Sequence, residues 1–146
     1  MKIRTKEDIH ECISMYLSLS DESFLPSDYN SAYKSLFNAV RTKHFVRCIR
    51  ENNVIVAWIY CEPVQVQHMK EPVFQQIYYC SLSTGRNAVR YVKILHDEMI
   101  IEAKKRGLEY CTSTGSHMDP SFVFARILEK NGWQRRGFIA VKHLDD

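Results

Sequence analysis

The stretch from Tyr78 to Ala88 has the residue pattern with the clearest chemistry in this 146-residue chain. Tyr78 to Leu82 carries no charge and is typical of a buried strand, and Ser83, Thr84 and Gly85 then supply turn and capping chemistry before a helical pattern. A strand that enters a tight glycine turn and then a helix presents unpaired N–H groups and the positive end of the helix dipole. The stretch therefore predicts a cradle for an anion. An ordinary strand-to-helix connection is the alternative that this stretch alone leaves open.

Candidate acid and base residues are dispersed along the chain. His117 is the histidine of greatest functional interest because it falls in a polar loop, Ser113–Met118. His96 lies on the apolar stripe of a helix and is expected to be a satisfied core residue. Glu62 and Glu71 lie at strand ends, where either could act as a base through water, and the alternative for both is a solvated strand-end acid.

Nucleophilic chemistry has less support in the sequence. Ser116, His117 and Asp119 are too close together for a hydrolase triad, whose members normally come from separate elements. A cysteine hydrolase built on Cys80 or Cys111 would need a neighbour that lowers the pKa of the thiol, and neither residue has an evident one in the sequence.

The bulk composition restricts the class of protein. The chain is 45% hydrophobic and 25% charged, with a net charge of +3, which predicts one globular domain over residues 1–146. The charge fits an anionic small ligand, but no segment combines basic and aromatic residues as nucleic-acid-binding proteins do. The five cysteines lack metal-ligand spacing, so buried free thiols and no metal site are expected. Neither a signal peptide nor a membrane-spanning run is recognisable, which predicts a cytoplasmic location.

Alternating helical and strand patterns predict the elements that position these residues. After the turn, apolar residues recur at helical spacing from Ala88 to Ala103, and Arg106-Gly107 ends that helix. Two earlier helices are expected, one with Thr5 as N-cap and an acid at Asp8, and one capped by Ser27. A short helix should follow Pro120. The expected strands are Lys2–Arg4, Phe45–Arg50, Val54–Cys61, Val73–Leu82, Leu108–Thr112 and Phe138–Leu144.

This order of elements resembles the Gcn5-related N-acetyltransferase (GNAT) family. The closest local match is Ala125 to Trp133, a helix that ends in Glu-Lys-Asn-Gly-Trp, followed by Arg136-Gly137-Phe138. The second match is the turn after Leu82 with its helix ending at Gly107. Together these features cover Thr5 to Leu144. The resemblance implies an α/β fold with a mixed, mostly antiparallel sheet that splays between the Val73–Leu82 strand and Leu108–Thr112.

The resemblance also implies a reaction: acetyl-CoA would donate its acetyl group to an unidentified primary amine. Acetyl-CoA would lie in the splayed gap, with its pyrophosphate on N–H groups around Thr84 to Ala88 and its pantetheine along Cys80 to Leu82. Glu62 and His117 are the candidates for proton transfer. The implied cofactor-binding set is Cys80, Ser81, Leu82, Ser83, Thr84, Gly85, Arg86, Asn87 and Ala88.

Three positions depart from the family pattern. Arg86 stands where the phosphate loop usually has glycine, and Leu128 stands where many members have the tyrosine that protonates the leaving thiolate. Gln75 and Gln76 occupy strand positions that often hold a carboxylate. The alternative is therefore a catalytically degenerate member with a structural or interaction role, similar to acetyltransferase-like bacteriophage proteins of the virion, for which protein partners are expected. A module that holds CoA without turnover is a third possibility.

Overall fold

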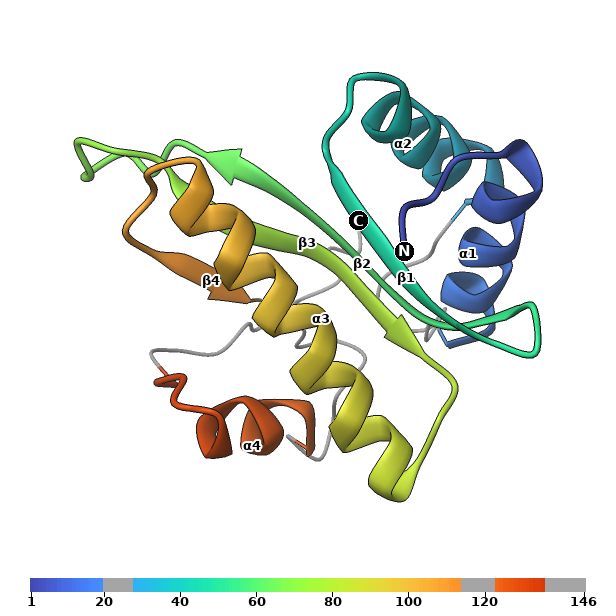
Figure 1. The fold of residues 1–146 in the computed structure, drawn as a ribbon. Helices are drawn as coiled ribbons and strands as arrows, with labels where there is room; N and C mark the ends of the chain where they lie inside the picture. Colours follow the sequence, from blue (N-terminus) through green and yellow to red (C-terminus); the bar gives the residue numbers. More distant parts are fainter. Residues whose placement is uncertain (20–27, 114–122, 136–146) are drawn as a thin grey trace, which may run out of the picture.

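The computed structural model describes residues 1–19, 28–113 and 123–135. The helices and strands in these segments form a mixed α/β fold, with two helices, three strands, and then a helix, a strand and a helix (Figure 1). In chain order they are α1 (Lys6–Leu19), α2 (Tyr29–Arg41), β1 (Phe45–Glu51), β2 (Val54–Val64), β3 (Val73–Ser81), α3 (Gly85–Lys105), β4 (Cys111–Ser113) and α4 (Val123–Lys130).

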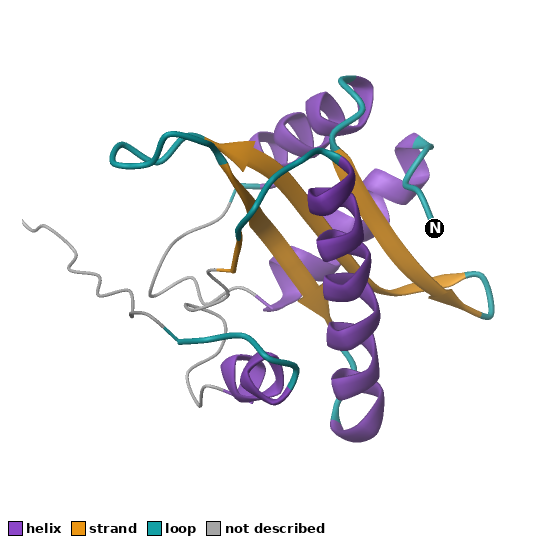
Figure 2. Cartoon of the chain, turned by 60° about the vertical axis from the view of Figure 1, so that its left-hand side comes forward, coloured by secondary structure: helices purple, strands orange, loops and turns teal. Residues whose placement is uncertain are grey.

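The strands form one sheet in the order β1-β2-β3-β4. β1 pairs with β2 and β2 with β3 in antiparallel fashion, whereas β3 pairs with β4 in parallel. The predicted mixed, mostly antiparallel sheet is therefore confirmed. Helices α1 and α2 cover one face of the sheet, and α3 crosses the other face with α4 beside it (Figures 1 and 2).

Each face of the sheet packs into its own apolar core. Trp58 and Tyr60 of β2 join α1 and α2 in one cluster, while Ala57, Ile59 and Cys61 join α3 in the other. Burial on both faces explains why β2 is apolar at nearly every position rather than at alternate ones. The cysteines of the chain are free thiols, and all but the half-buried Cys111 are buried, as the sequence predicts.

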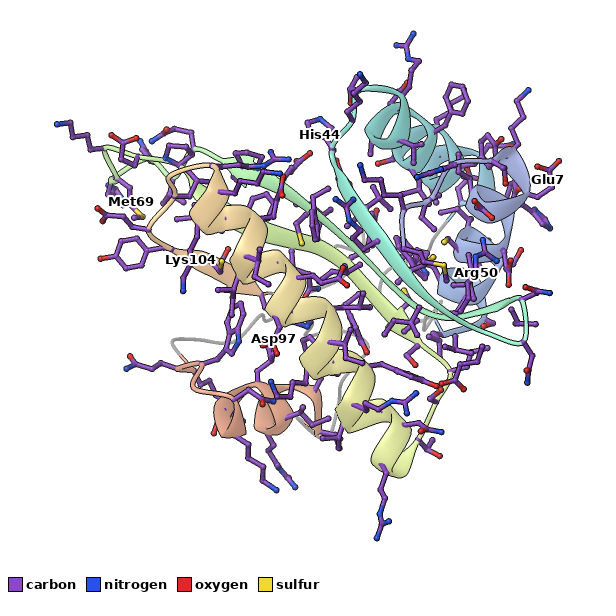
Figure 3. The ribbon with its side chains drawn as sticks, in the orientation of Figure 1. Glu7, His44, Arg50, Met69, Asp97 and Lys104 are labelled. Atoms are coloured by element: carbon purple, nitrogen blue, oxygen red, sulfur yellow. The ribbon has the colours of Figure 1, made fainter. Side chains whose placement is uncertain are left out.

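The N-terminus of α1 has the predicted capping arrangement. The N–H of Asp8 donates to Thr5 Oγ1 at 3.0 Å, and the N–H of Thr5 donates back to Asp8 Oδ2 at 3.2 Å. Asp8 also forms an ion pair with Arg50 of β1, which Figure 3 labels beside α1. The N–H of Ile55 donates to Glu11 Oε1 at 2.6 Å. Two carboxylates of α1 therefore tie this helix to the β1–β2 hairpin.

Several element boundaries differ from the prediction. Asp28 rather than Ser27 is the N-cap of α2, because its carboxylate accepts the N–H of Ser31 at 2.9 Å. Lys2 forms only an isolated bridge with Arg47 and no strand. The predicted strand at Leu108–Thr112 is displaced, since β4 begins at Cys111. The predicted closing strand, Phe138–Leu144, lies outside the described residues.

The β1–β2 turn is a tight two-residue connection made by two asparagines. Asn52 and Asn53 have φ values of 50° and 64°, in the left-handed region that asparagine tolerates better than most residues. Positive φ at both central positions is the conformation of a type I′ hairpin turn, whose twist matches that of the flanking strands. The hairpin therefore places Arg50 and Ile55 side by side under α1.

Candidate functional site

The free edge of β3 is the centre of the candidate site. β4 pairs with β3 over only three positions, and the last pair is Gln76 with Ser113. Immediately afterwards β3 has a β-bulge, because Tyr60 of β2 pairs with Tyr78 whereas Cys61 pairs with Gln76, which leaves Ile77 without a partner. Among the described residues, the part of β3 from Ile77 onward therefore has no strand on its β4 side. The described pairing between β3 and β4 ends at this point.

A cavity of about 190 Å³ lies beside this free edge. Its lining combines the end of β3, the start of α3, α4 and the end of α1. The lining residues are Leu19, Tyr79, Cys80, Ser81, Ser83, Ala88, Val92, Val123, Phe124 and Ile127. Leu19 and Cys80 pack with the α1–α2 core, whereas Tyr79 packs with the α3 and α4 clusters. The lining of the cavity therefore includes residues that pack on both faces of the sheet.

The N-terminus of α3 borders this cavity and has no side-chain cap. The helix begins at Gly85, one turn before the predicted stripe, and its N-cap residue Thr84 makes no side-chain capping hydrogen bond, contrary to the predicted capping hydroxyl. Gly85 has φ +61°, and a Cβ built there would meet no atom within 4 Å. Arg86 is exposed and forms no ion pair with the described residues. Uncapped N–H groups, open space and a free cation together suit an anion.

Ser81 shapes the turn into α3 instead of facing a ligand freely. Its hydroxyl donates to the carbonyl of Val56 at 2.9 Å and accepts the N–H of Ser83 at 3.1 Å. Ser81 and Ser83 line the cavity, but the Ser83 N–H is already used within the protein. The N–H groups left for an anion are therefore those further along, from Thr84 onward.

A buried polar cluster lies where β3 and β4 separate. Ser113 Oγ and His96 Nε2 lie 2.5 Å and 3.2 Å from Gln76 Oε1, and His96 Nδ1 lies 2.8 Å from the carbonyl of Val92. Burial lowers the pKa of His96 to about 4, so the ring is neutral at physiological pH. A neutral imidazole has one N–H, and here it lies on Nδ1 and donates to the carbonyl of Val92, so Nε2 accepts. Rotation of the Gln76 amide by a half-turn would present its NH2 group to both His96 Nε2 and Ser113 Oγ.

The aromatic side chains around His96 connect this cluster to α4. The His96 ring lies 5.4 Å from the Phe124 ring and 5.7 Å from the Trp133 ring, measured between centroids. Tyr79 stacks on Phe124 at 5.1 Å. The wall of the cavity on this face of the sheet is therefore aromatic and held by side chains from three elements, β3, α3 and α4.

Leu128 lies inside this apolar packing. It is 7% exposed and clusters with Val92, Ile127, Tyr79 and Phe124. The position where the sequence lacks the expected tyrosine is therefore filled by a buried aliphatic side chain that cannot donate a proton.

Of the two predicted proton-transfer residues, only Glu62 lies among the described residues. Glu62 lies on β2, pairs in register with Gln75 and accepts a hydrogen bond from the Tyr60 hydroxyl. Glu62 is not among the residues that line the cavity. His117, with its neighbours Ser116 and Asp119, lies outside the described residues.

Four of the nine predicted cofactor-binding residues line the cavity, and the other five adjoin them in the sequence. Cys80, Ser81, Ser83 and Ala88 line it, and Leu82 is 59% exposed beside it. Thr84, Gly85, Arg86 and Asn87 form the exposed first turn of α3.

A second hollow lies elsewhere on the surface. It has a volume of about 540 Å³, is more open than the cavity, and lies between α1 and α2 beside His10 and Tyr29. None of the predicted site residues contributes to its lining. In the described part of the chain no group of three or more His, Cys, Asp or Glu could hold a metal ion. None of the helices in that part has the length and apolar character needed to span a bilayer.

Comparison with solved structures identifies the fold. An N-acetyltransferase from Staphylococcus aureus Mu50 superposes with a TM-score of 0.71 at 13% identity, over 93% of this chain and 83% of that chain. Aminoglycoside N-acetyltransferase AAC(6')-Iy, in complex with a bisubstrate analogue, CoA-S-monomethyl-acetylneamine, gives 0.72 at 10% identity over 99% and 97%. The chain has the GNAT fold.

The GNAT fold is shared with structures that contain the donor. A predicted acetyltransferase from Clostridium acetobutylicum, solved with acetyl-CoA, gives a TM-score of 0.68 at 18% identity over 95% of this chain and 92% of that chain. No family model matches the sequence, and no curated protein matches it either. These GNAT neighbours lend no support to the resemblance to bacteriophage proteins.

Residues that the sequence did not assign to the site come from β3, α3, α4 and the end of α1. Tyr79 is the one polar residue among them. The others are the apolar residues Leu19, Val92, Val123, Phe124 and Ile127. Helical spacing marks Val92, Phe124 and Ile127 as apolar stripe residues but does not show which stripe borders a cavity.

Proposed function

We propose that this protein is an N-acetyltransferase that transfers the acetyl group of acetyl-CoA to a primary amine. The observation that carries the proposal is the position of the cavity. It lies beside the end of β3, between the uncapped N-terminus of α3 and helix α4, and its lining includes residues from both faces of the sheet. A donor and an acceptor entering from opposite faces would meet there. The GNAT neighbours solved with CoA ligands support the same assignment.

In this proposal the chain binds the donor mainly through its backbone. The N–H groups from Gly85 to Ala88 and the guanidinium of Arg86 hold the pyrophosphate, because both present positive charge to an anion. The exposed apolar side chains of Leu82 and Val123, at 59% and 51% exposure, cover the pantetheine. The bulge at Ile77 interrupts the pairing of β3 beside the reacting thioester. Binding and orientation of the two substrates would then supply most of the acceleration.

Proton removal from the amine is assigned to Glu62, acting through water, and His117 is proposed as an acid–base residue of the same site. Glu62→Gln and His117→Ala are each expected to lower turnover at neutral pH. An unchanged rate in either variant removes that residue from the proposed mechanism.

The experiment that tests the proposal is a calorimetric titration with acetyl-CoA and with free CoA. We expect the wild-type protein to bind both in the micromolar range. Gly85→Asp and Gly85→Asn are the matched variants, because both side chains tolerate positive φ, both enter open space and only the first adds charge. Asp is expected to weaken binding at least about tenfold relative to Asn, since it places a carboxylate beside the pyrophosphate. Equal affinities would remove the α3 N-terminus from the site.

The outcome also separates the alternatives. Absence of binding up to millimolar acetyl-CoA would favour a degenerate GNAT-fold protein with a structural or interaction role, such as a virion assembly component. Two observations favour that candidate: Leu128 is buried among apolar residues, and Arg86 occupies the expected glycine position. Binding without transfer to any amine of a panel containing neamine, spermidine and a lysine peptide would favour a CoA-binding module.

A further inference from the structure

We propose that the acceptor is an aromatic amine, a compound whose amino group is bonded directly to an aromatic ring. This inference rests on the proposed acetyltransferase function and names the class of its second substrate. The nitrogen of such an amine is uncharged at neutral pH, because its lone pair is shared with the ring. Spermidine, neamine and a lysine side chain instead carry ammonium groups, so an enzyme that acetylates them must bind a cation and remove its proton first.

The described residues that line the cavity offer an ammonium ion no opposite charge. None of them is an Asp, Glu, Lys, Arg or His. Burial raises the pKa of the Tyr79 phenol and of the Cys80 thiol above their ordinary values, so both groups stay neutral. The Ser81 hydroxyl is already bonded to the Val56 carbonyl and to the Ser83 N–H. An ammonium ion that left water for this cavity would therefore lose its hydration without compensation.

The polar and charged groups around the cavity do not supply that opposite charge. Gln76 and His96 hydrogen-bond each other, and the imidazole is neutral at physiological pH. Glu62 accepts a hydrogen bond from the Tyr60 hydroxyl and does not line the cavity. The charge that borders the cavity is positive, because it comes from the N-terminus of α3 and the guanidinium of Arg86. The site therefore attracts an anionic donor and disfavours a cationic acceptor.

The size and the walls of the cavity fit one aromatic ring. Its volume is about 190 Å³, and a cavity of about 150 Å³ lined by leucine, isoleucine and phenylalanine holds benzene. Phe124 provides an aromatic surface and stacks on Tyr79 at 5.1 Å between centroids, with 26° between the ring planes. Val92 and Ile127 add aliphatic contacts. A single ring fills such a space, whereas the chain of a polyamine would extend beyond it.

An aromatic amine also accounts for the missing carboxylate on β3. Gln75 and Gln76 are neutral amides at the positions where the sequence lacks the expected base. The lone pair of an aromatic amine is free at neutral pH, so no residue has to remove a proton before the nitrogen attacks. The remaining proton is lost only after the new bond has formed, when the nitrogen is positively charged and strongly acidic. Transfer of that proton to water is the step assigned above to Glu62.

The proposed step balances in atoms and charge. The lone pair of the nitrogen forms a bond to the thioester carbonyl carbon, and the carbon–sulfur bond breaks with its electron pair on sulfur. The nitrogen loses one proton to water, and the thiolate takes one proton from water. The products are the N-aryl acetamide and the CoA thiol, with no oxidation or reduction.

The test compares aniline with benzylamine, in which one methylene separates the ring from the nitrogen and restores an ammonium group. Both are offered to the full chain with acetyl-CoA at pH 7, beside spermidine, neamine and the lysine peptide, and kcat/KM is measured from release of the CoA thiol. Calorimetry of the protein saturated with free CoA measures the affinity for each amine without the reaction. We expect aniline to exceed benzylamine at least about tenfold in both quantities, because only benzylamine has to bring a charge out of water.

Leu19→Asp and Leu19→Asn are the matched variants. Leu19 lines the cavity at the end of α1 and is half-buried, so a polar side chain is tolerated there. The two new side chains have nearly the same size, and only aspartate adds an anion. The ratio of benzylamine affinity to aniline affinity should be at least about tenfold higher in Leu19→Asp than in Leu19→Asn. Urea midpoints check the folding of both, and Val123→Asp with Val123→Asn repeats the comparison at an exposed lining position of α4.

Each contrary outcome is specific. Acetylation of benzylamine or spermidine with a kcat/KM equal to or above that of aniline would overturn the inference and leave the proposed function intact. An unchanged affinity ratio in both aspartate variants would also overturn it, because the amine would then bind away from the described lining. Wild-type protein that binds acetyl-CoA but acetylates no amine of the panel, aniline included, would exclude an aromatic acceptor and leave only a binding module. Wild-type protein that does not bind acetyl-CoA would refute the proposed function itself.

Discussion

Gln76 and Ser113 contact each other through both backbone and side chain at the point where two strands part. They form the last pair in the register of β3 and β4, and their side chains hydrogen-bond at 2.5 Å. The next residue, Ile77, is the bulge at which β3 loses its partner on β2. The cluster of Gln76, Ser113 and His96 therefore lies where the described pairing of β3 with β4 ends.

Mutation of this cluster should show coupling between its members. Ser113→Ala is expected to cost about 1 kcal/mol of unfolding free energy, and Gln76→Leu about 2 kcal/mol, because the latter leaves His96 Nε2 and the Ser113 hydroxyl unpaired in the interior. The double variant should cost less than the sum of the two, since they remove the same hydrogen bond. Urea unfolding of the wild type, the two single variants and the double variant measures these losses. Strictly additive losses would contradict a hydrogen bond between the two side chains.

His96 should make stability depend on pH in the weakly acidic range. Its pKa in the folded protein is lowered to about 4, below the ordinary value near 6.5, so the unfolded chain binds the extra proton first. The stabilising effect of the neutral ring is complete above pH 6.5 and is lost as the pH falls toward 4. Urea midpoints from pH 7.5 to 4.5 should fall for the wild-type protein more steeply than for His96→Gln. An NMR titration of the His96 ring with a midpoint near 6.5 would refute this.

The Asp8–Arg50 pair should matter more than ion pairs on the exposed surface. Burial alone would raise the pKa of Asp8, but hydrogen bonds from the N–H groups of Arg4 and Thr5, together with the charge of Arg50, outweigh it and lower the pKa. Asp8→Asn should therefore cost roughly 1–2 kcal/mol at pH 7.

The control and the pH dependence test this explanation. The difference between Asp8→Asn and wild type is present above pH 4 and should vanish as the pH falls through the lowered pKa of Asp8, where the wild-type carboxyl is also neutral. Asp97→Asn breaks the exposed pair of Asp97 with Lys93 and should change stability by less than about 0.5 kcal/mol. Equal losses in the two variants would mean that burial of the Asp8 pair contributes nothing.

The hairpin turn offers a substitution expected to stabilise the protein. Asn53 has φ 64°, and glycine adopts that conformation without the steric cost that a side chain imposes. Asn53→Gly should therefore raise the unfolding free energy by roughly 0.5 kcal/mol, after allowance for the greater entropy of glycine in the unfolded chain. Asn53→Ala is the matched control and should lower it, because alanine lacks the local hydrogen bonding that lets asparagine occupy this region. Thermal melting of both variants measures the difference, and a lower melting temperature for glycine would contradict it.

Local sequence patterns predicted most of the helices and the β1–β2 hairpin because their determinants are close in sequence. Thr5 with Asp8, the asparagine turn, and the glycines at 107 and 132 each act within a few residues. The boundary errors have the same local origin. Ser27 and Asp28 are both good caps, and only the hydrogen bond from Ser31 decides between them.

The site itself was predicted less completely, and β3 shows why. Alternation along a strand assigns every second residue to one face, and Phe74 and Gln76 do face α3. Continued alternation would place Tyr78 on that face and Tyr79 on the other. The bulge at Ile77 reverses the assignment, so Tyr78 packs toward α1 and Tyr79 lines the cavity. A bulge depends on the register with β2, which the residues of β3 alone do not specify.

The buried cysteines make this protein a natural probe of its own partial unfolding. A buried thiol reacts with an alkylating reagent only when its surroundings open, so the labelling rate of each cysteine under native conditions measures the free energy of one opening motion. Cys12, Cys48 and Cys80 lie in the core under α1 and α2, and Cys80 also lines the cavity, whereas Cys61 lies in the core under α3. Mass spectrometry of labelled peptides would therefore distinguish undocking of the first two helices from undocking of α3, without any mutation. A CoA ligand that enters the cavity should slow the labelling of Cys80 selectively.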